Sequence, residues 1–211
     1  MTILFDLDGT LIDSTEAIVS SFQDSFEYFG NTPPKKDEIT KLIGYPLEIM
    51  YSSLGVDEKK VSDFVTVYKK YYRQRSKPMT QLLPNATKAI ELASSFATLG
   101  IVTTKTGLYS KELLKYMNIM QYFEVIIGRE DVTNPKPHPE PILKALKLLN
   151  ADKSKSWMIG DTTMDLEAAK YANIQSIALS CGYGNKQEFF QFTKYIKRNA
   201  LEAVLFIENL V

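Results

Sequence analysis

Short apolar runs alternate with stretches of helical periodicity along most of this chain, and this alternation constrains the fold more than any other feature. The apolar runs end in polar or glycine-rich loops and cover residues 2–5, 99–104, 124–128, 157–160 and 176–180. The helical stretches cover residues 85–96, 110–120, 139–149 and 166–173. Strands this apolar are buried on both faces, so the sequence predicts an α/β fold with a parallel sheet and helices on both of its faces.

One long segment interrupts the alternation. From residue 15 to residue 79 only helical patterns occur, and glycine or proline separates them. A strand, then a helical segment, then the rest of an α/β domain is the pattern of an insertion after the first strand. We therefore predict a Rossmann-like catalytic core from residues 1–14 and 80–211, and an all-helical cap, residues 15–79, over the carboxyl edge of the sheet. The alternative is a helical subdomain with no catalytic part.

Net charge and the rare residues narrow the possible functions. The 25 basic and 25 acidic residues cancel, which removes the general electrostatic argument for nucleic acid or an anionic membrane as a partner. Cys181 is the only cysteine and His138 the only histidine, so the chain holds neither an internal disulfide nor a conventional zinc site. Chemistry must come from carboxylates, hydroxyls, lysines and a hard metal ion. No apolar run is long enough to span a bilayer, and we expect a cytoplasmic location.

Two aspartates follow the first predicted strand in the sequence DLDGT. A turn directly after Asp6 aims the carboxylates of Asp6 and Asp8 at one point, although like charges at this spacing repel each other. Gly9 permits a tight turn, and Thr10 is expected to bond to the local backbone. The alternative is an Asx turn with two solvated acids, which the motif alone predicts equally well.

Two other segments offer groups that can hold an anion. Thr103 and Thr104 end the second predicted strand, where a hydroxyl can donate to a phosphate oxygen, although β propensity alone also favours threonine there. Lys136 lies in the sequence NPKPHPEP, where Pro137 biases it toward extended backbone and Pro139 suits the first turn of the next helix. Because the loop is stiff, we favour the interpretation that Lys136 is a fixed ammonium that binds an anion. The alternative is that the segment only precedes the next helix.

A second acidic pair lies in the sequence GDTTMD. Asp161 follows the fourth predicted strand and Asp165 lies one helical turn later, so both carboxylates face the same spot. Helix capping is the commonest reason for aspartate at such positions. Four carboxylates at two strand ends would nevertheless raise one another's pKa values unless a divalent cation lies among them, and oxygen ligands favour Mg²⁺.

These motifs make the chain resemble the haloacid dehalogenase-like hydrolase superfamily. The motifs occur in the order Asp6-x-Asp8-Gly-Thr, Thr103, Lys136 and Gly-Asp161 with Asp165. The resemblance covers the whole chain, including the helical insertion after the first motif. Within the superfamily, the segments LIGYPLE, YFEVIIGREDV and CGYG are most similar to the phosphoglycolate phosphatase-like branch.

The resemblance implies a chemical role for four of these residues. Asp6 would be the nucleophile that attacks phosphorus and forms an aspartyl-phosphate. Asp8 would protonate the leaving oxygen and then activate the water that hydrolyses this intermediate. Thr103 and Lys136 would hold the phosphoryl oxygens. The protein would therefore be a phosphoric monoester hydrolase.

The resemblance also implies a metal site. Asp161, the Asp6 carboxylate and the backbone carbonyl of Asp8 would bind Mg²⁺, and Asp165 would support the metal site or Lys136 from behind. The family often has asparagine where this chain has Thr104. This difference affects one expected contact near the substrate, but it does not affect the expected reaction.

Specificity is expected to come from the cap. The cap would close over the site and exclude water, and we expect its specificity surface near Gly44, Tyr45 and Pro46. In the core, Tyr183, Gly184 and Lys186 follow the last predicted strand, where they either border the site or form a plain turn.

The predicted function is the Mg²⁺-dependent hydrolysis of a small phosphorylated metabolite, either phosphoglycolate-like or a sugar phosphate. A sugar-phosphate mutase of the same superfamily is an alternative, because it keeps Asp8 and a similar cap. A non-enzymatic alternative is a phosphoaccepting signalling module, which uses similar strand-end residues but lacks the insertion. A dehalogenase would not need Asp8 as an acid.

Overall fold

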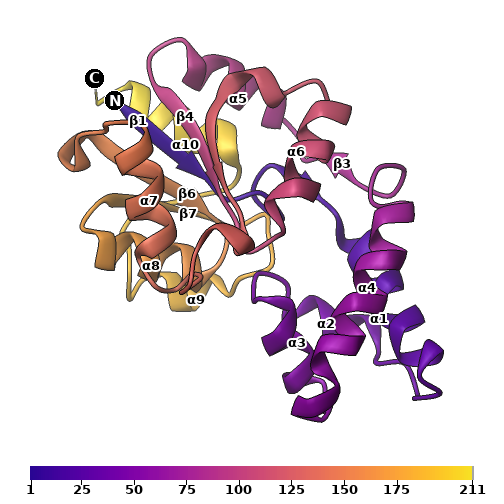
Figure 1. Cartoon of the computed structure of the whole chain (residues 1–211). Coiled ribbons are helices and arrows are strands. Elements are labelled where there is room, and N and C mark those ends of the chain that lie inside the picture. Colours follow the sequence, from indigo (N-terminus) through magenta and orange to yellow (C-terminus); the bar gives the residue numbers. More distant parts are fainter. Residues whose placement is uncertain (211) are drawn as a thin grey trace. The chain divides into compact units, whose positions relative to one another are not determined.

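The computed structural model describes residues 1–210, which form two compact units. The first unit contains Met1–Asp13 and the chain from Leu82 onward, and the second contains Ser14–Gln81 (Figure 1). The helical insertion predicted over residues 15–79 lies inside the second unit. Two short strands at the junctions, β2 (Ile12–Asp13) and β3 (Gln81–Leu82), pair with each other.

Within the described residues, the first unit contains one parallel sheet of six strands. The strands, in their order across the sheet, are β5 (Phe123–Ile127), β4 (Thr98–Val102), β1 (Thr2–Phe5), β6 (Ser156–Gly160), β7 (Gln175–Leu179) and β8 (Ile196–Lys197). The predicted α/β fold with a parallel sheet is confirmed. β8 was not predicted, because two residues are too few to show a periodicity.

Alternate residues of β1 pack on opposite faces of the sheet, as strand geometry requires. The helices of this unit are α5 (Ala86–Ser94), α6 (Gly107–Tyr116), α7 (Glu140–Leu148), α8 (Thr163–Ala172), α9 (Lys186–Phe189) and α10 (Ala200–Glu208). Ile3 and Phe5 belong to the apolar cluster of α5, α6 and α10, whereas Leu4 packs with α7 and α8. Both faces are covered, which explains why the strands are continuously apolar.

Three of these helices are followed by an asparagine in the left-handed backbone region. These residues are Asn118 (φ 56°), Asn150 (φ 49°) and Asn173 (φ 59°), after α6, α7 and α8. In each case the N–H of the next residue donates to the carbonyl oxygen five residues earlier, which ends the helix with a Schellman motif. The helix predicted over residues 110–120 therefore stops at Tyr116.

The order of the strands brings the functional residues together. The neighbouring strands β4, β1 and β6 all end at the same edge, and Thr103, Asp6 and Asp161 are the next residues after them. The ladder continues one residue beyond two of the strands. The N–H of Asp6 donates to the oxygen of Ile159 at 2.9 Å, and the N–H of Thr103 donates to the oxygen of Ile127 at 3.0 Å.

The second unit is helical and has an aromatic core. Its helices are α1 (Thr15–Tyr28), α2 (Lys36–Thr40), α3 (Leu47–Ser53) and α4 (Val61–Arg75), with a 3₁₀ turn at Glu58–Lys60. Ring centroids lie 4.5 Å apart for Phe22 and Tyr51, and 5.2 Å apart for Phe26 and Phe64. The Tyr51 hydroxyl is 2.7 Å from the Ser25 hydroxyl. Within the described residues, no helix combines the length and the hydropathy that crossing a membrane requires.

The left-handed residue after α8 gives a test of the fold. We expect Asn173→Ala to lower the free energy of unfolding by about 1 kcal/mol, because a residue with a Cβ and no side-chain amide is disfavoured in this conformation. Asn173→Gly should leave it unchanged or raise it, since glycine has no Cβ. Urea unfolding of the three proteins measures both effects. Equal stability of the alanine and glycine variants would contradict the role given to the backbone conformation.

Candidate functional site

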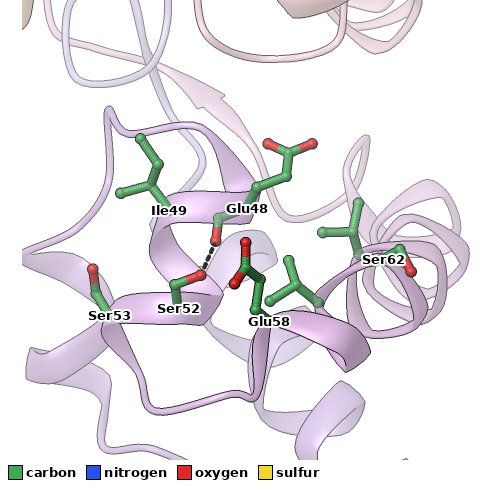
Figure 2. A pocket seen from close by; sticks show the side chains of 8 residues that line it. Glu48, Ile49, Ser52, Ser53, Glu58 and Ser62 are labelled. Atoms are coloured by element: carbon green, nitrogen blue, oxygen red, sulfur yellow. Dashed lines mark hydrogen bonds between the residues drawn. The ribbon is translucent and has the colours of Figure 1, made fainter.

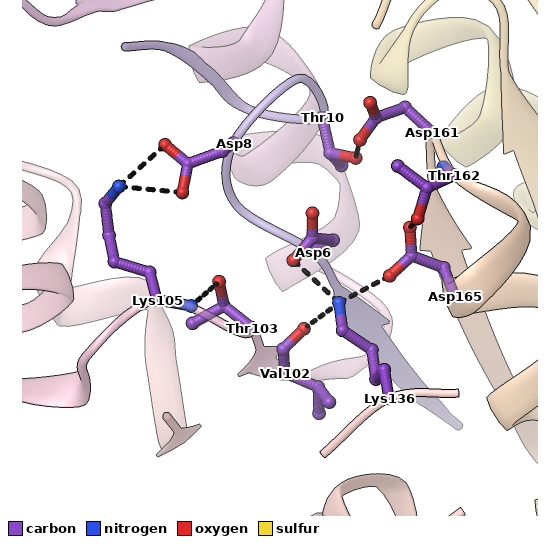
Figure 3. Close-up of polar contacts among 10 residues, drawn as sticks. All are labelled: Asp6, Asp8, Thr10, Val102, Thr103, Lys105, Lys136, Asp161, Thr162 and Asp165. Atoms are coloured by element: carbon purple, nitrogen blue, oxygen red, sulfur yellow. Dashed lines mark hydrogen bonds and ion pairs between the residues drawn. The ribbon is translucent and has the colours of Figure 1, made fainter. Parts of the chain in front are cut away.

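The ammonium of Lys136 connects two of the aspartates at the carboxyl edge of the sheet (Figure 3). It donates to Asp6 Oδ1 at 2.8 Å, to Asp165 Oδ1, and to the backbone oxygen of Val102 at 2.9 Å. Lys136 is 3% exposed, and these bonds use all three of its N–H donors. The ammonium is therefore fixed, as the proline-flanked loop predicted. That it holds phosphoryl oxygens stays a prediction.

The loop around Lys136 leads into α7. The Lys136–Pro137 peptide bond is cis. Pro139 occupies the N-cap position and α7 begins one residue later than expected, so Pro141 lies in the first turn. His138 is exposed, and its Nδ1 accepts from the N–H of the helix's first residue at 3.1 Å.

The two carboxylate oxygens of Asp165 have different partners. Oδ2 accepts from the N–H of Thr162 at 3.0 Å and from the Thr162 hydroxyl at 2.7 Å, which caps the start of α8. Oδ1 accepts from Lys136. The capping and the functional interpretations of this residue are therefore compatible, because the cap fixes the orientation in which Asp165 meets the lysine. Gly160 has no side chain that would overlap the Asp165 carboxylate.

Asp161 is fully buried and receives hydrogen bonds from two distant segments. Thr10 donates its hydroxyl to Oδ1 at 2.7 Å, and Tyr183 donates its backbone N–H to Oδ2 at 2.9 Å. The expectation that Thr10 bonds to the local backbone is wrong: β1 and β6 are neighbours, so its hydroxyl reaches the loop after β6. The loop after β7 borders the site, and a Cβ at Gly182 or Gly9 would overlap Asp161.

Asp8 forms an ion pair with Lys105, which the sequence interpretation did not identify. The Lys105 ammonium lies 3.0 Å from Asp8 Oδ1 and 2.9 Å from Oδ2 (Figure 3). The N–H of Lys105 donates to the Thr103 hydroxyl oxygen at 3.1 Å. Thr103 therefore accepts a bond within its own loop, which leaves its hydroxyl proton for a donor role, and Thr104 follows it as a half-buried residue. The sequence signal that could have identified Lys105 is its position two residues after Thr103, at the end of a predicted strand.

The charges in this region do not balance. Four carboxylates face two ammonium groups. Lys105 is half-buried and the other five residues are buried, namely Asp6, Asp8, Asp161, Asp165 and Lys136. If every group is ionised, two negative charges are left over. A buried charge without a partner is costly, so a divalent cation bound at this edge would stabilise the ionised carboxylates.

The pKa values show the same excess of negative charge. Burial raises the pKa of Asp6 to about 7, and Lys136 only partly opposes this rise. Burial, with the nearby charges of Asp6 and Asp165, raises the pKa of Asp161 well above its usual range. Burial alone would lower the pKa of Lys136, but the two contacting carboxylates outweigh it and raise this pKa.

The donor atoms fit Mg²⁺. Among the described residues, Asp6, Asp161 and Asp165 each present a carboxylate oxygen within 4.8 Å of the others. A set of oxygen ligands without histidine or cysteine suits a hard cation. The side chain of Asp8 is not part of this group, which is compatible with the expectation that Asp8 contributes only its backbone carbonyl to the metal site.

The predicted cap residues lie in the helical unit. Gly44 precedes α3 and has φ 110°, a conformation that favours glycine. Tyr45 is exposed, and Pro46 is the buried N-cap of α3. Contact of these residues with a substrate stays a prediction, Gly44 included.

A pocket of about 540 Å³ lies within the helical unit, between α3, the 3₁₀ turn and α4 (Figure 2). Ser52 donates its hydroxyl to the backbone oxygen of Glu48 at one side of it, at 3.0 Å. Glu48 and Glu58 line the pocket with serine, isoleucine and valine, and no basic residue is among the lining residues. This pocket therefore does not suit a phosphate, whereas the cluster of aspartates and lysines has the groups that phosphoryl chemistry needs.

Comparison with known proteins shows which family the chain resembles. The family model for haloacid dehalogenase-like hydrolase matches residues 3–179. Pyrophosphatase PpaX from Bacillus mycoides is 33% identical over 180 residues, which are 85% of this chain and 83% of the relative. A haloacid dehalogenase-like family hydrolase from Streptococcus pneumoniae has a TM-score of 0.88 at 30% identity and covers 97% of both chains.

A structure described as a predicted phosphoglycolate phosphatase from Haemophilus somnus has a TM-score of 0.89 at 21% identity. It covers 97% of this chain and 96% of its own. At this identity the similarity shows the fold alone.

The contacts around Asp161 predict the effect of a small substitution. We expect Gly182→Ala to weaken Mg²⁺ binding by about tenfold or more, because the new Cβ must push the Asp161 carboxylate out of place. Calorimetric titration with Mg²⁺ measures this change. Lys88→Ala, at an exposed position of α5, is the control. If the Gly182→Ala variant binds Mg²⁺ as tightly as the wild type, Asp161 is not a ligand of the metal.

Proposed function

The chain belongs to the haloacid dehalogenase-like hydrolases, and from this premise we propose that it is a Mg²⁺-dependent phosphatase that hydrolyses a small phosphomonoester through an aspartyl-phosphate on Asp6. One observation carries the proposal. Asp6 is 4% exposed, lies at the end of the central strand β1, and contacts Lys136 beside Asp161 and Asp165. A carboxylate held this way has the positive charge and the oxygen ligands that phosphoryl transfer requires.

In the proposed first step, an oxygen of Asp6 attacks phosphorus and the bond from phosphorus to the leaving oxygen breaks. Asp8 gives its proton to that oxygen. In the second step, Asp8 takes a proton from water, the water oxygen attacks phosphorus, and the bond to Asp6 breaks. Phosphate leaves, and both aspartates return to their first states. Dividing the hydrolysis in this way replaces one difficult step by two easier ones.

The proposed roles of the other residues follow from charge. An attacking carboxylate and a phosphate dianion repel each other, so cations must surround both. Lys136 neutralises part of this charge and Thr103 offers its hydroxyl to a phosphoryl oxygen; Thr104 is the proposed further contact. Mg²⁺ would be held by Asp6, Asp161 and the backbone oxygen of Asp8, with Asp165 behind them, and would supply positive charge at the transferring group.

A second candidate is the hydrolysis of pyrophosphate. It is supported by the 33% identity to relatives named Pyrophosphatase PpaX, which extends over 85% of this chain. The same residues serve both reactions, because pyrophosphate differs from a phosphomonoester only in the leaving group, a second phosphate. The sugar-phosphate mutase and the signalling module use the same nucleophile and differ in the fate of the phosphoryl group.

The nucleophile is tested by removing its charge. We expect Asp6→Asn to lower kcat about a thousandfold or more, because no aspartyl-phosphate can form. Wild-type protein quenched in acid during turnover should carry one phosphoryl group on the peptide that contains Asp6, detected by mass spectrometry. Asp63→Asn, an exposed residue of α4, is the matched control. Full activity of Asp6→Asn would refute the mechanism.

A panel of substrates separates the candidate reactions. The panel contains phosphoglycolate, sugar phosphates, nucleotides and pyrophosphate, each assayed for phosphate release and for isomerisation. We expect phosphate release from at least one of them, lost when a chelator removes divalent cations and restored by Mg²⁺. Isomerisation of a sugar phosphate without net release would instead assign a mutase, and a stable phosphoprotein without turnover would assign a signalling module.

A further inference from the structure

Lys105 is the one charged side chain of the site that the proposed reaction does not use. Its ammonium lies within 3.0 Å of both carboxylate oxygens of Asp8, and the two side chains are 9% and 10% exposed. Figure 3 shows the Asp8 carboxylate turned toward Lys105 and away from Asp161 and Asp165. A cation in this position determines where the carboxylate can point.

The backbone of Lys105 is fixed at both its polar groups. Its N–H donates to the Thr103 hydroxyl oxygen at 3.1 Å, and its oxygen accepts from the N–H of Arg129 at 3.0 Å. The first contact ties it to the end of β4 and the second to the loop after β5. The lysine therefore extends toward Asp8 from a base that the sheet holds in place.

The alternative partner for the Asp8 carboxylate is the metal site itself. The oxygens of Asp6, Asp161 and Asp165 cluster within 4.8 Å, and Asp8 follows Asp6 by two residues in the same turn. A carboxylate that is mobile beside a hard divalent cation is a good ligand for it. Once bound to the cation, it would no longer be available to the leaving group.

We propose that Lys105 is a positioning residue that keeps the Asp8 carboxylate out of the cluster of Asp6, Asp161 and Asp165 and directed toward the leaving group. This inference rests on the proposed function. It explains why two identical carboxylates of one short motif have different lysines as partners, Lys136 for Asp6 and Lys105 for Asp8. Lys105 then acts through Asp8 and does not itself touch the transferring phosphoryl group.

Metal binding tests this inference without turnover. The proteins are the wild type, Lys105→Met, Asp8→Ala and the double variant, each titrated calorimetrically with Mn²⁺ alone. We expect Lys105→Met to bind Mn²⁺ at least about threefold more tightly than the wild type, because the released Asp8 carboxylate joins the cluster. In the Asp8→Ala background, the same substitution should change the dissociation constant by less than about twofold.

The comparison between backgrounds separates positioning from simple charge. If Lys105→Met tightens binding equally with and without the Asp8 carboxylate, the effect is only the loss of a positive charge and the inference is wrong. No change in either background also overturns it. Lys115→Met, an exposed residue of α6, controls for the loss of a lysine at a distance.

Leaving-group dependence gives the second measurement. We expect Lys105→Met to lower kcat/KM for an alkyl phosphate about tenfold more than for an aryl phosphate, whose leaving group needs little protonation. In the Asp8→Ala background, Lys105→Met should lower kcat/KM equally for the two substrates. Lys105→Arg should retain part of the wild-type kcat/KM for the alkyl phosphate. Equal losses on both substrates would overturn the inference. Because the Mn²⁺ titrations need no turnover, they test the role of Lys105 even if Asp6→Asn disproves the proposed reaction.

Discussion

An excess of buried negative charge is the constraint on which the rest of the site depends. Four carboxylates meet at the edge where β4, β1 and β6 end, and Lys136 and Lys105 neutralise only part of their charge. Removing a carboxylate from water is tolerated only when donors or cations replace the water. The elements around this edge provide the hydrogen-bond donors and the space that these carboxylates require.

The fold provides these donors from segments that are far apart in the sequence. Thr10 and the Tyr183 backbone hold Asp161, and Thr162 holds Asp165 while it caps α8. Space is provided by glycines, since a Cβ at Gly182 would occupy the place of the Asp161 carboxylate. These contacts orient each oxygen separately, so the site is organised before any substrate binds.

Sequence patterns predicted which residues follow the strands but not which residues they would contact. The apolar runs placed Asp6, Thr103 and Asp161 at strand ends, because strand length and polarity are local properties. The order of the strands is not local. Only a sheet in which β1 lies between β4 and β6 brings Lys105 to Asp8 and Thr10 to Asp161, so these contacts were missed or assigned wrongly. The C-terminal strand β8 was missed for the simpler reason that it is too short.

The same strand order explains how one motif produces two different carboxylates. Asp6 continues the ladder of β1 toward β6 through its bond to Ile159, which leaves its side chain beside Lys136 and the second acidic pair. The chain then turns at Gly9, where φ is 83°, and Asp8 meets the residue that follows β4 by three positions, Lys105. Two aspartates that are chemically identical in the sequence thus differ in their neighbours, because Lys136, which also bonds to the Val102 oxygen, meets the carboxylate at the end of β1, whereas Lys105 meets the carboxylate in the turn that follows.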